Sequence, residues 1–537
     1  MRTVASSDTK TGLAHMLDKI KSALLASFCG SLAAICTSCA AGHLLASRYQ
    51  VTLTVILRYV FSAPANTWPH DVRGAATLVV AIFMACTFLL WLSLKDMRWG
   101  SSAGDLTGSY AISNLLSKST IPAEPSIFAG TFSGKRLQVG IEDRGLVIGP
   151  PGTGKTAFLL NQVLQASASR LSFVLVDIKP ELHTIIGASL KAKGYRVFRI
   201  NPATVDADAD HWNPLDEVND ETELAELCSA LLPIRSPEEA PFIEAQRDWL
   251  EAAMFHVKST PGGSLPSAFN LLSSESDPLK ILSVLGRSQS PVSAQIARRM
   301  AAGLSGSKPD PLILQGLTGC MRSLKFLSLP GVQDSLGHSD FSIRDLGHSQ
   351  VPSALFLQFE ESKIAALGPL LAFAATASLT TLIRTANDRA PVALFLDELG
   401  NMPPLPNLAE KLNTIRSRHM PTWMYFQSAQ QIEKRYGTGA TDIFFASADV
   451  QMVFRLNDQA TRALVSQLIG TTLKKKTTVS TDASGGRSHS QTRERVNVIE
   501  PHELGRLKPG QILLLYRGAA ALGWATPYFV DYPKFRK

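Results

Sequence analysis

The 537-residue sequence contains few charged side chains for its length. Asp, Glu, Lys and Arg make up 18% of the residues, below the usual quarter, whereas apolar residues make up 45%. This shift is typical of a chain that lies partly in a membrane. The composition excludes wholesale disorder, a collagen-like fibre and a disulfide scaffold.

Cysteine is also scarce. Of the six cysteines, four lie in apolar stretches near the N-terminus, and the other two, Cys228 and Cys320, are far apart in the sequence. Because no zinc or redox spacing occurs, cysteine carries no chemistry that the sequence reveals. The net charge of +8 is mild, so it permits an anionic partner without requiring one. At roughly 150 residues per domain, the length indicates three or four structural units.

Two long N-terminal runs contain no Asp, Glu, Lys or Arg, at residues 22–47 and 75–94. Each is long enough to cross the roughly 30 Å hydrocarbon core of a bilayer as a helix. The alternative for the first run is a signal peptide, but the apolar part of a signal peptide spans only about 7–15 residues. We therefore predict that residues 1–100 form a membrane anchor with two transmembrane helices.

A phosphate-binding loop is the most specific local motif. Residues 144–148 read as a buried strand, and an apolar helix start follows position 156, so the G-x-x-x-x-G-K-T pattern stands in its required context. The loop residues are Gly149, Pro150, Pro151, Gly152, Thr153, Gly154, Lys155 and Thr156. Backbone N–H groups at a helix N-terminus favour phosphate, so the loop is expected to bind ATP. Lys155 is expected to reach the β and γ phosphates, and Thr156 to bind Mg²⁺ through its hydroxyl. The alternative is a glycine turn that caps an ordinary helix.

An apolar run at 392–396 leads into two acidic residues, Asp397 and Glu398. A buried strand that ends in two acids can deliver one carboxylate to Mg²⁺ and the other to the attacking water, so we assign Asp397 to the metal and Glu398 to water activation. Lys155 and Asp397 lie 242 positions apart, a gap that disfavours AAA-type ATPases and small GTPases. The absence of an LSGGQ-like signature disfavours ABC-type transporter ATPases.

Short apolar strands alternate with helical patterns along the rest of the chain, which predicts an α/β fold with a mostly parallel sheet covered on both faces. Besides the strand before the loop, the expected strands are 172–177, 195–200, 353–359, 391–397, 422–426 and 450–455. This alternation stops at 221–345, which we expect to be an inserted all-helical subdomain. Residues 101–220 and 346–537 would then form the two parts of the nucleotide-binding domain. We expect 474–494, rich in Lys, Ser, Thr and Gly, to be a mobile loop.

Six strings in order now resemble one family. They are Gly108-Ser109, the stretch Asp177 to Leu182 (DIKPEL), Trp212 to Asp216 (WNPLD), Phe395 to Asn401, Phe426-Gln427-Ser428 with Tyr436-Gly437, and Asn457-Asp458-Gln459. The chain resembles the TraG/TraD-type coupling proteins of conjugative type IV secretion systems, relatives of the FtsK/HerA-like DNA pumps. The likeness covers about residues 108–531. One departure is the AAA-like loop GPPGTGKT, which leaves phosphate binding intact.

The resemblance implies a RecA-like P-loop ATPase that assembles as a homo-hexamer around a channel. In such rings a neighbouring subunit supplies an arginine to the γ phosphate. Arg416 matches this arginine finger, with Arg418 as the second candidate. Gln427 would lie beside the acidic strand and sense the γ phosphate. Lys179 and Glu181 match family positions, where a structural ion pair and a functional role are equally open.

The function implied is a coupling ATPase in the bacterial inner membrane with its ATPase domain in the cytoplasm. It would recruit single-stranded DNA bound to a relaxase, or protein effectors, to the type IV secretion channel and energise transfer by ATP hydrolysis with Mg²⁺. The candidates for DNA contact are Lys474, Lys475, Lys476 and Arg487, although a lysine run is more often a solvated surface. The alternatives are an FtsK-like DNA translocase and a non-catalytic membrane adaptor that binds nucleotide only to assemble.

Overall fold

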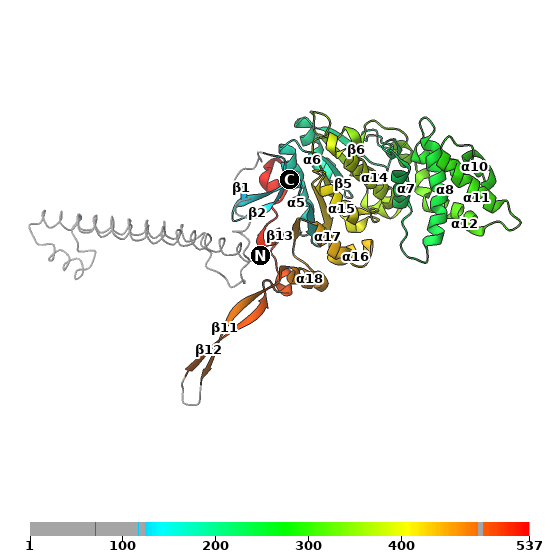
Figure 1. Ribbon diagram of the computed structural model, residues 1–537. Coiled ribbons are helices and arrows are strands. Elements are labelled where there is room, and N and C mark those ends of the chain that lie inside the picture. The colour runs from blue at the N-terminus through cyan, green and yellow to red at the C-terminus, as the bar shows by residue number, and fades with distance from the viewer. Residues whose placement is uncertain (1–69, 71–115, 118–123, 482–486, 536–537) are drawn as a thin grey trace, which may run out of the picture. The chain divides into compact units, whose positions relative to one another are not determined.

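The computed structural model describes residue 70, residues 116–117, 124–481 and 487–535 (Figure 1). The chain divides into a unit of residues 1–103 and a unit of residues 104–537. The two predicted membrane spans, 22–47 and 75–94, lie outside the described residues and stay predictions.

Twelve strands of the described part form one sheet, in the order β1-β3-β2-β14-β13-β10-β4-β9-β8-β5-β7-β6. The seven from β10 to β6 run parallel to one another. They are β4 (Gly145–Ile148), β5 (Ser172–Asp177), β6 (Arg196–Ile200), β7 (Ser353–Gln358), β8 (Val392–Leu396), β9 (Thr422–Phe426) and β10 (Val450–Val453). All seven occupy the ranges that the apolar runs predict, to within two residues. The mostly parallel α/β sheet is therefore confirmed.

An antiparallel extension completes the sheet on the β10 side. It consists of β1 (Leu116–Ser117), β2 (Ser126–Phe132), β3 (Lys135–Gly140), β13 (Gln511–Tyr516) and β14 (Ala519–Trp524). The sequence analysis did not anticipate these strands. Their pairing brings Thr131 of β2 opposite Trp524 of β14, so segments almost 400 residues apart are neighbours.

Alternate residues of the parallel strands enter two different cores, as the two-residue period of a strand requires. On β5, Val174 and Val176 join one core, while Phe173 and Leu175 join the other. Helices cover both faces, which explains why these strands read as nearly continuous apolar runs. The Phe173 core packs against α5 (Lys155–Ala168) and α6 (Leu182–Ala192).

The Val174 core packs against the helices of the opposite face. These helices are α14 (Ile364–Arg384), α15 (Leu408–Arg416), α16 (Ala429–Tyr436), α17 (Ala440–Ser447) and α18 (Gln459–Ile469). The span Glu361–Arg384, which contains α14, is the single described helix long and apolar enough to cross a membrane, yet 78% of its most apolar window is buried inside the protein. Its apolar character therefore fits a core helix of this domain.

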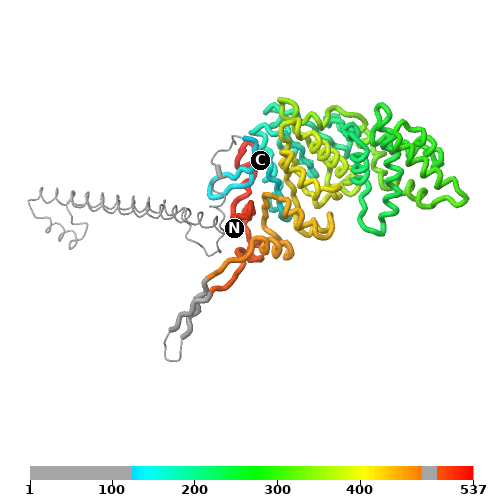
Figure 2. Tube along the Cα trace, in the orientation of Figure 1, coloured from blue at the N-terminus to red at the C-terminus, as the bar shows by residue number. Residues whose placement is uncertain are grey.

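Between β6 and β7 the chain forms a group of helices, drawn in green in Figure 2. They are α7 (Glu221–Leu231), α8 (Ala240–Lys258), α9 (Leu265–Ser273), α10 (Pro278–Leu285), α11 (Pro291–Leu304), α12 (Pro311–Ser323) and α13 (Pro330–Ser335). Three of them start with an N-cap side chain followed at once by proline: Asp277 before α10, Ser290 before α11 and Asp310 before α12. The cap satisfies a free backbone N–H, and the proline ring has a helical φ, so these dipeptides fix where each helix begins.

The expectation of a mobile loop at 474–494 is wrong. Strands β11 (Thr471–Thr481) and β12 (Arg487–Asn497) pair as an antiparallel hairpin that projects beside α18 (Figure 1). Thr and Val, which occur in both segments, favour strands. The lysine and glycine content concealed this β propensity. Two short helices follow, α19 (Pro501–Leu504) and α20 (Tyr528–Asp531).

Candidate nucleotide-binding and hydrolysis site

The phosphate-binding loop joins the carboxyl end of β4 to the first turn of α5. Gly149 begins the loop, and its N–H donates to the carbonyl oxygen of Phe426, the last residue of β9, at 3.1 Å. A Cβ at Gly149 would lie 2.6 Å from Cβ of Phe454, so no larger residue fits there without displacing the backbone. Gly154 caps α5 in the left-handed region, with φ of 97°. The loop therefore has the conformation that opens the helix N-terminus toward an anion.

Lys155 is the first residue of α5 and is buried. Its ammonium donates hydrogen bonds to the carbonyl oxygens of Gly149 and Pro150, the latter at 3.3 Å, and so lies back over the loop. Burial lowers the pKa of Lys155, and the nearby charges of Glu398 and Asp397 partly offset this effect. The loop lysine and the two acids therefore share one electrostatic environment, although they are far apart in the sequence.

The two acids follow β8, which is separated from β4 by the single strand β9. Both side chains are buried, Asp397 to 2% exposure and Glu398 to 3%. Burial, followed by the charge of Glu398, raises the pKa of Asp397 to about 7. Parallel strands end at the same edge of a sheet, so β4, β9 and β8 bring the loop, Gln427 and the acids to one place.

Glu398 is held by three side chains. Gln427, directly after β9, donates through Nε2 to Glu398 Oε2 at 2.9 Å, and Asn401 donates through Nδ2 to the same oxygen at 3.1 Å. Lys179 lies on the other side, with its Nζ 3.7 Å from Glu398 Oε1. The backbone of Glu398 is left-handed, with φ of 52°, which is unusual for a residue other than glycine. These contacts fix the direction of a carboxylate that a strained backbone turns toward the loop.

Asp177 ends β5, the strand next to β8. Its side chain is fully buried, and its Oδ1 has no hydrogen-bond partner among the described residues. Burial, with a contribution from the charge of Asp397, raises the pKa of Asp177 to about 8. Unsatisfied buried oxygens are rare in folded proteins and often mark functional positions.

The residues at this edge fit a magnesium ion chemically. Mg²⁺ prefers oxygen ligands and uses one or two carboxylates together with phosphate oxygens and waters. Asp397 supplies a carboxylate, and the half-buried Thr156 supplies a hydroxyl one residue after the loop lysine. A cation here would also offset the repulsion between Asp397 and Glu398 that raises the pKa of Asp397.

The two candidate arginine fingers lie at the end of α15, away from these contacts. Arg416 is the last residue of α15 and is exposed, and its guanidinium forms no hydrogen bond or ion pair with the described residues. Arg418 instead donates from its guanidinium to Asn387 Oδ1 at 2.9 Å. Arg416 is therefore the freer of the two to reach a neighbouring molecule.

Residues 111–535 match the family described as type IV secretory system conjugative DNA transfer. The chain belongs to this family. The match covers the whole parallel sheet and the inserted helices, and it confirms the family that the six sequence strings indicate.

The relatives of this chain include VirD4 of Rhizobium radiobacter, which is 22% identical over 402 residues. That match covers 72% of this chain and 57% of VirD4, so the chain spans little more than half the length of that relative. The conjugal transfer protein TraG of Escherichia coli is 24% identical over 440 residues, covering 74% of this chain and 66% of TraG.

Solved structures of the conjugative coupling protein TrwB share the fold. Unbound TrwB lacking its first 70 residues matches with a TM-score of 0.61 and 18% identity, over 75% of this chain and 89% of that one. TrwB has also been solved with a non-hydrolysable ATP analogue (TM-score 0.60, 18% identity, 76% of this chain and 90% of that one). A third structure holds ADP and Mg²⁺ (TM-score 0.59, 18% identity, 72% of this chain and 85% of that one). Together with the mostly parallel sheet, this likeness supports a RecA-like P-loop fold for this chain.

Three further residues of this site were not predicted from the sequence. The sequence analysis gave Lys179 no mechanism and assigned no role to Asp177 or Asn401, although all three lie in strings that carry the family resemblance. Lys179 and Asn401 contact Glu398 directly. The position of Asp177 in the sequence could have indicated its place in the site. Asp177 follows an apolar run just as Asp397 does, and parallel strands that end in acids place those acids along one edge of the sheet.

Proposed function

We propose that this protein is a membrane-anchored ATPase that couples single-stranded DNA carrying a relaxase, or protein effectors, to a type IV secretion channel. The observation that carries the proposal is the grouping of Lys155, Asp397, Glu398 and Gln427 at one edge of the sheet. A phosphate loop alone binds nucleotide, whereas a buried carboxylate held beside it can also activate water.

Each residue has a distinct role in this proposal. Residues 149–156 hold the phosphates of ATP, and Lys155 turns from its loop carbonyls to the β and γ phosphates. Thr156 and Asp397 hold Mg²⁺, which neutralises the charge of the transferring phosphate when bound. Glu398 accepts a proton from the attacking water, and Gln427 senses the γ phosphate through its bond to Glu398. Lys179 helps to hold the Glu398 side chain in place through its ion pair with Oε1.

The assembly proposed is a homo-hexamer in the bacterial inner membrane. Residues 1–100 would anchor it through the two predicted spans, with the ATPase domain in the cytoplasm, where ATP is present. Residues 101–220 and 346–537 would form the nucleotide-binding domain and residues 221–345 the inserted helical subdomain. The exposure of Arg416 supports a role for this guanidinium at the γ phosphate of a neighbouring subunit.

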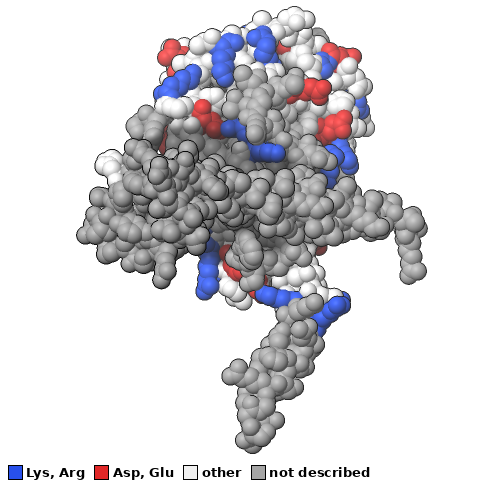
Figure 3. Space-filling model, turned by 90° about the vertical axis from the view of Figure 1, so that its left-hand side faces the viewer, with Lys and Arg blue, Asp and Glu red and all other residues white. Residues whose placement is uncertain are grey.

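The proposed DNA contact lies in the hairpin of β11 and β12. Its register pairs Lys475 with Arg493, so basic residues stand directly opposite each other near its base. Lysine and arginine are the residues that bind the phosphates of DNA. On the face in Figure 3, by contrast, the basic and acidic side chains of the described residues are interspersed and form no continuous basic patch.

The deciding experiment compares ATP hydrolysis by the full chain with that of Glu398→Gln, with and without single-stranded DNA. The variant keeps the size and hydrogen bonds of the side chain but cannot accept the proton, so hydrolysis should fall at least about 100-fold while ATP binding persists. Glu275→Gln is the matched control, since Glu275 is exposed in the helical insertion. Unchanged hydrolysis in Glu398→Gln would contradict the assignment of Glu398 to water activation. If the wild type binds ATP and DNA as the variant does but hydrolyses no ATP, the protein is a non-catalytic adaptor.

Mixing two inactive variants tests the role of Arg416. A subunit with Arg416→Ala retains its own Glu398, and a neighbour with Glu398→Gln retains its arginine. If Arg416 acts across the subunit interface, the mixture regains hydrolysis that neither variant has alone. Absence of recovery, with both variants still assembled, would remove Arg416 from this role.

A further inference from the structure

The helical insertion joins the sheet domain through two chain segments that lie side by side, which we call the neck: residues 211–217 on the way out and 335–343 on the way back. Backbone bonds join the two segments. The Trp212 N–H donates to the carbonyl oxygen of Ser335 at 2.8 Å, and the Asp340 N–H donates to that of His211 at 2.9 Å. The neck therefore holds the insertion in place on the sheet domain.

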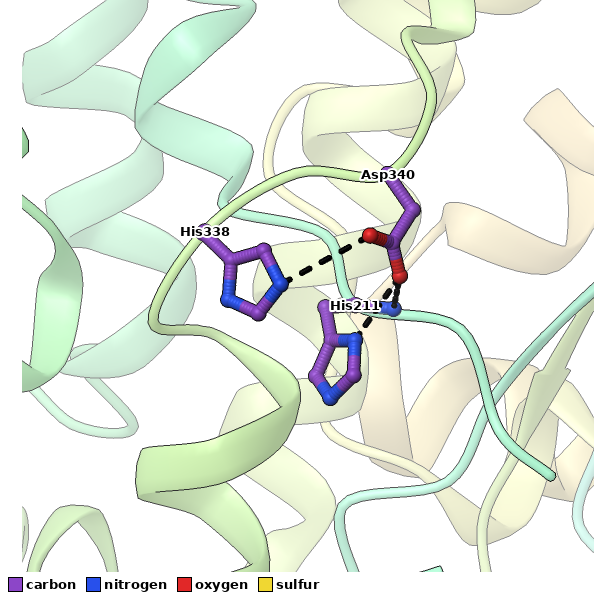
Figure 4. Close-up of side chains that lie close together, drawn as sticks. All are labelled: His211, His338 and Asp340. Atoms are coloured by element: carbon purple, nitrogen blue, oxygen red, sulfur yellow. Dashed lines mark hydrogen bonds and ion pairs between the residues drawn. The ribbon is translucent and has the colours of Figure 1, made fainter. Parts of the chain in front are cut away.

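Three side chains that can bind a metal gather at the neck, His211 from the outgoing segment and His338 and Asp340 from the returning one (Figure 4). His211 Nδ1 lies 2.7 Å from Asp340 Oδ2, and His338 Nε2 lies 3.6 Å from Asp340 Oδ1. The two imidazole rings stack with centroids 4.3 Å apart. One carboxylate therefore faces a nitrogen of each histidine.

The spacing is close to that of a tetrahedral metal site. The three ligand atoms all lie within 4.8 Å of one another. Ligands at about 2.0–2.1 Å from a tetrahedral ion are about 3.4 Å apart. The separations of 2.7 and 3.6 Å run to different oxygens of Asp340, so the His211 ring would turn away from its hydrogen bond with Oδ2 to bind an ion. His338 is 62% exposed, so its ring is free to make the remaining adjustment.

A second carboxylate supports the orientation of His211. Asp334 Oδ1 lies 3.7 Å from His211 Nε2, the ring nitrogen that faces away from Asp340. A histidine that binds a metal through one nitrogen usually donates from the other to a carboxylate, which fixes the tautomer. Asp334 is in position to accept that bond after a small movement.

The donor set selects the class of metal. Two imidazoles and one carboxylate suit Zn²⁺ and neighbouring divalent transition metals, whereas Mg²⁺ and Ca²⁺ require oxygen ligands. The nucleotide site offers oxygens from Asp397 and Thr156, so the two sites differ in chemistry as well as in position. An excess of Mg²⁺ can therefore occupy the nucleotide site without competing at the neck.

We propose that His211, His338 and Asp340 form a binding site for Zn²⁺ or a similar divalent transition metal at the neck. The ion would cross-link two segments that are more than 120 positions apart and would stiffen the attachment of the helical insertion to the sheet domain. The exposed side of the site would leave a coordination position to water.

The test titrates Zn²⁺ into the full chain, purified without a histidine tag, stripped with a chelator and kept in excess Mg²⁺. Calorimetry, or competition with a zinc-binding dye, should reveal one Zn²⁺ per chain. His338→Ala should weaken this binding by at least about 10- to 100-fold, since loss of even an outer partner of a metal ligand has that effect. Because His338 is exposed, the variant retains the fold.

His348→Ala is the matched control, since His348 is also exposed and lies ten positions further along the returning chain. It should bind Zn²⁺ as the wild type does. Equal binding by His338→Ala and the wild type would place the ion elsewhere and overturn the proposal. Absence of stoichiometric Zn²⁺ binding by the wild type would overturn it as well.

Discussion

The edge of the sheet and the helical insertion differ in how deeply their charged side chains are buried. At the edge, Lys155, Asp397 and Glu398 are at most 5% exposed. Within the outer helices of the insertion, ion pairs lie at the surface: Arg299 with Asp248 has side chains 65% and 42% exposed. Exposed pairs contribute about 0–1 kcal/mol, whereas buried charges carry a desolvation penalty of several kcal/mol each.

The contrast separates residues that stabilise the protein from residues that serve its chemistry. The outer helices of the insertion are held by apolar packing and helix caps, and their exposed charges can be changed with little effect. The sheet edge keeps charges that oppose folding, which is expected where a charged ligand is bound. Changes in the two regions should therefore affect different properties.

The largest expected effect on stability is in the insertion. Trp249 of α8 is fully buried, and its Nε1 donates to the carbonyl oxygen of Ile313 in α12 at 2.8 Å. Trp249→Ala should lower the local free energy of unfolding by about 3–5 kcal/mol, measured by hydrogen exchange in α8. Arg299→Ala, the surface control, should change it by less than about 0.5 kcal/mol. If both variants lost a similar free energy of unfolding, buried packing and surface charge in the insertion would contribute equally to stability, contrary to our expectation.

The next effect concerns ligand binding at the sheet edge. Lys155→Ala removes an ammonium placed to bond phosphate, and a hydrogen bond to a charged group contributes about 1.5–3 kcal/mol. ATP affinity should therefore fall about 10- to 100-fold, measured with a fluorescent nucleotide. Lys280→Ala, at an exposed position in the insertion, is the control and should retain wild-type affinity. An unchanged affinity in Lys155→Ala would show that the loop backbone suffices.

The smallest expected effect is a dependence of the free energy of unfolding on pH, caused by Asp177. Its pKa is raised to about 8 by burial, so the folded chain holds a proton that the unfolded chain, with a pKa near 4, has lost. The stability tied to this carboxyl is therefore greatest below about pH 4 and declines as the pH rises toward 8. Asp177→Asn should gain stability relative to the wild type between pH 5 and pH 8, by at least about 1 kcal/mol in denaturant unfolding without nucleotide. A difference that does not change with pH would mean that Asp177 is ionised in the folded protein.

Local pattern was enough to predict the parallel strands and the loop. Continuous apolar runs such as 172–177 belong to strands buried on both faces, and the loop motif fixes its own strand and helix. The same logic places Asp397 and Glu398 at the loop, because parallel strands share an edge. The proximity of Gln427 to Glu398 follows for the same reason.

Features that depend on long-range pairing could not be predicted. Strands β2 and β14 pair across almost 400 residues, and neither carries a distinctive pattern. The hairpin at 471–497 was hidden by lysine, serine and glycine, which composition alone assigns to loops. The contact of Lys179 with Glu398 depends on how the turn after β5 is oriented, a detail that no spacing rule encodes.

The pairing of β13 with β10 and of β14 with β2 has a consequence for how the protein is made. Until residues 511–524 have left the ribosome, β10 and β2 each lack a neighbouring strand on one side. By then nearly all of the domain has already been synthesised. The growing chain therefore presents open strand edges at β10 and β2, and this side of the sheet is completed only after β13 and β14 have been translated.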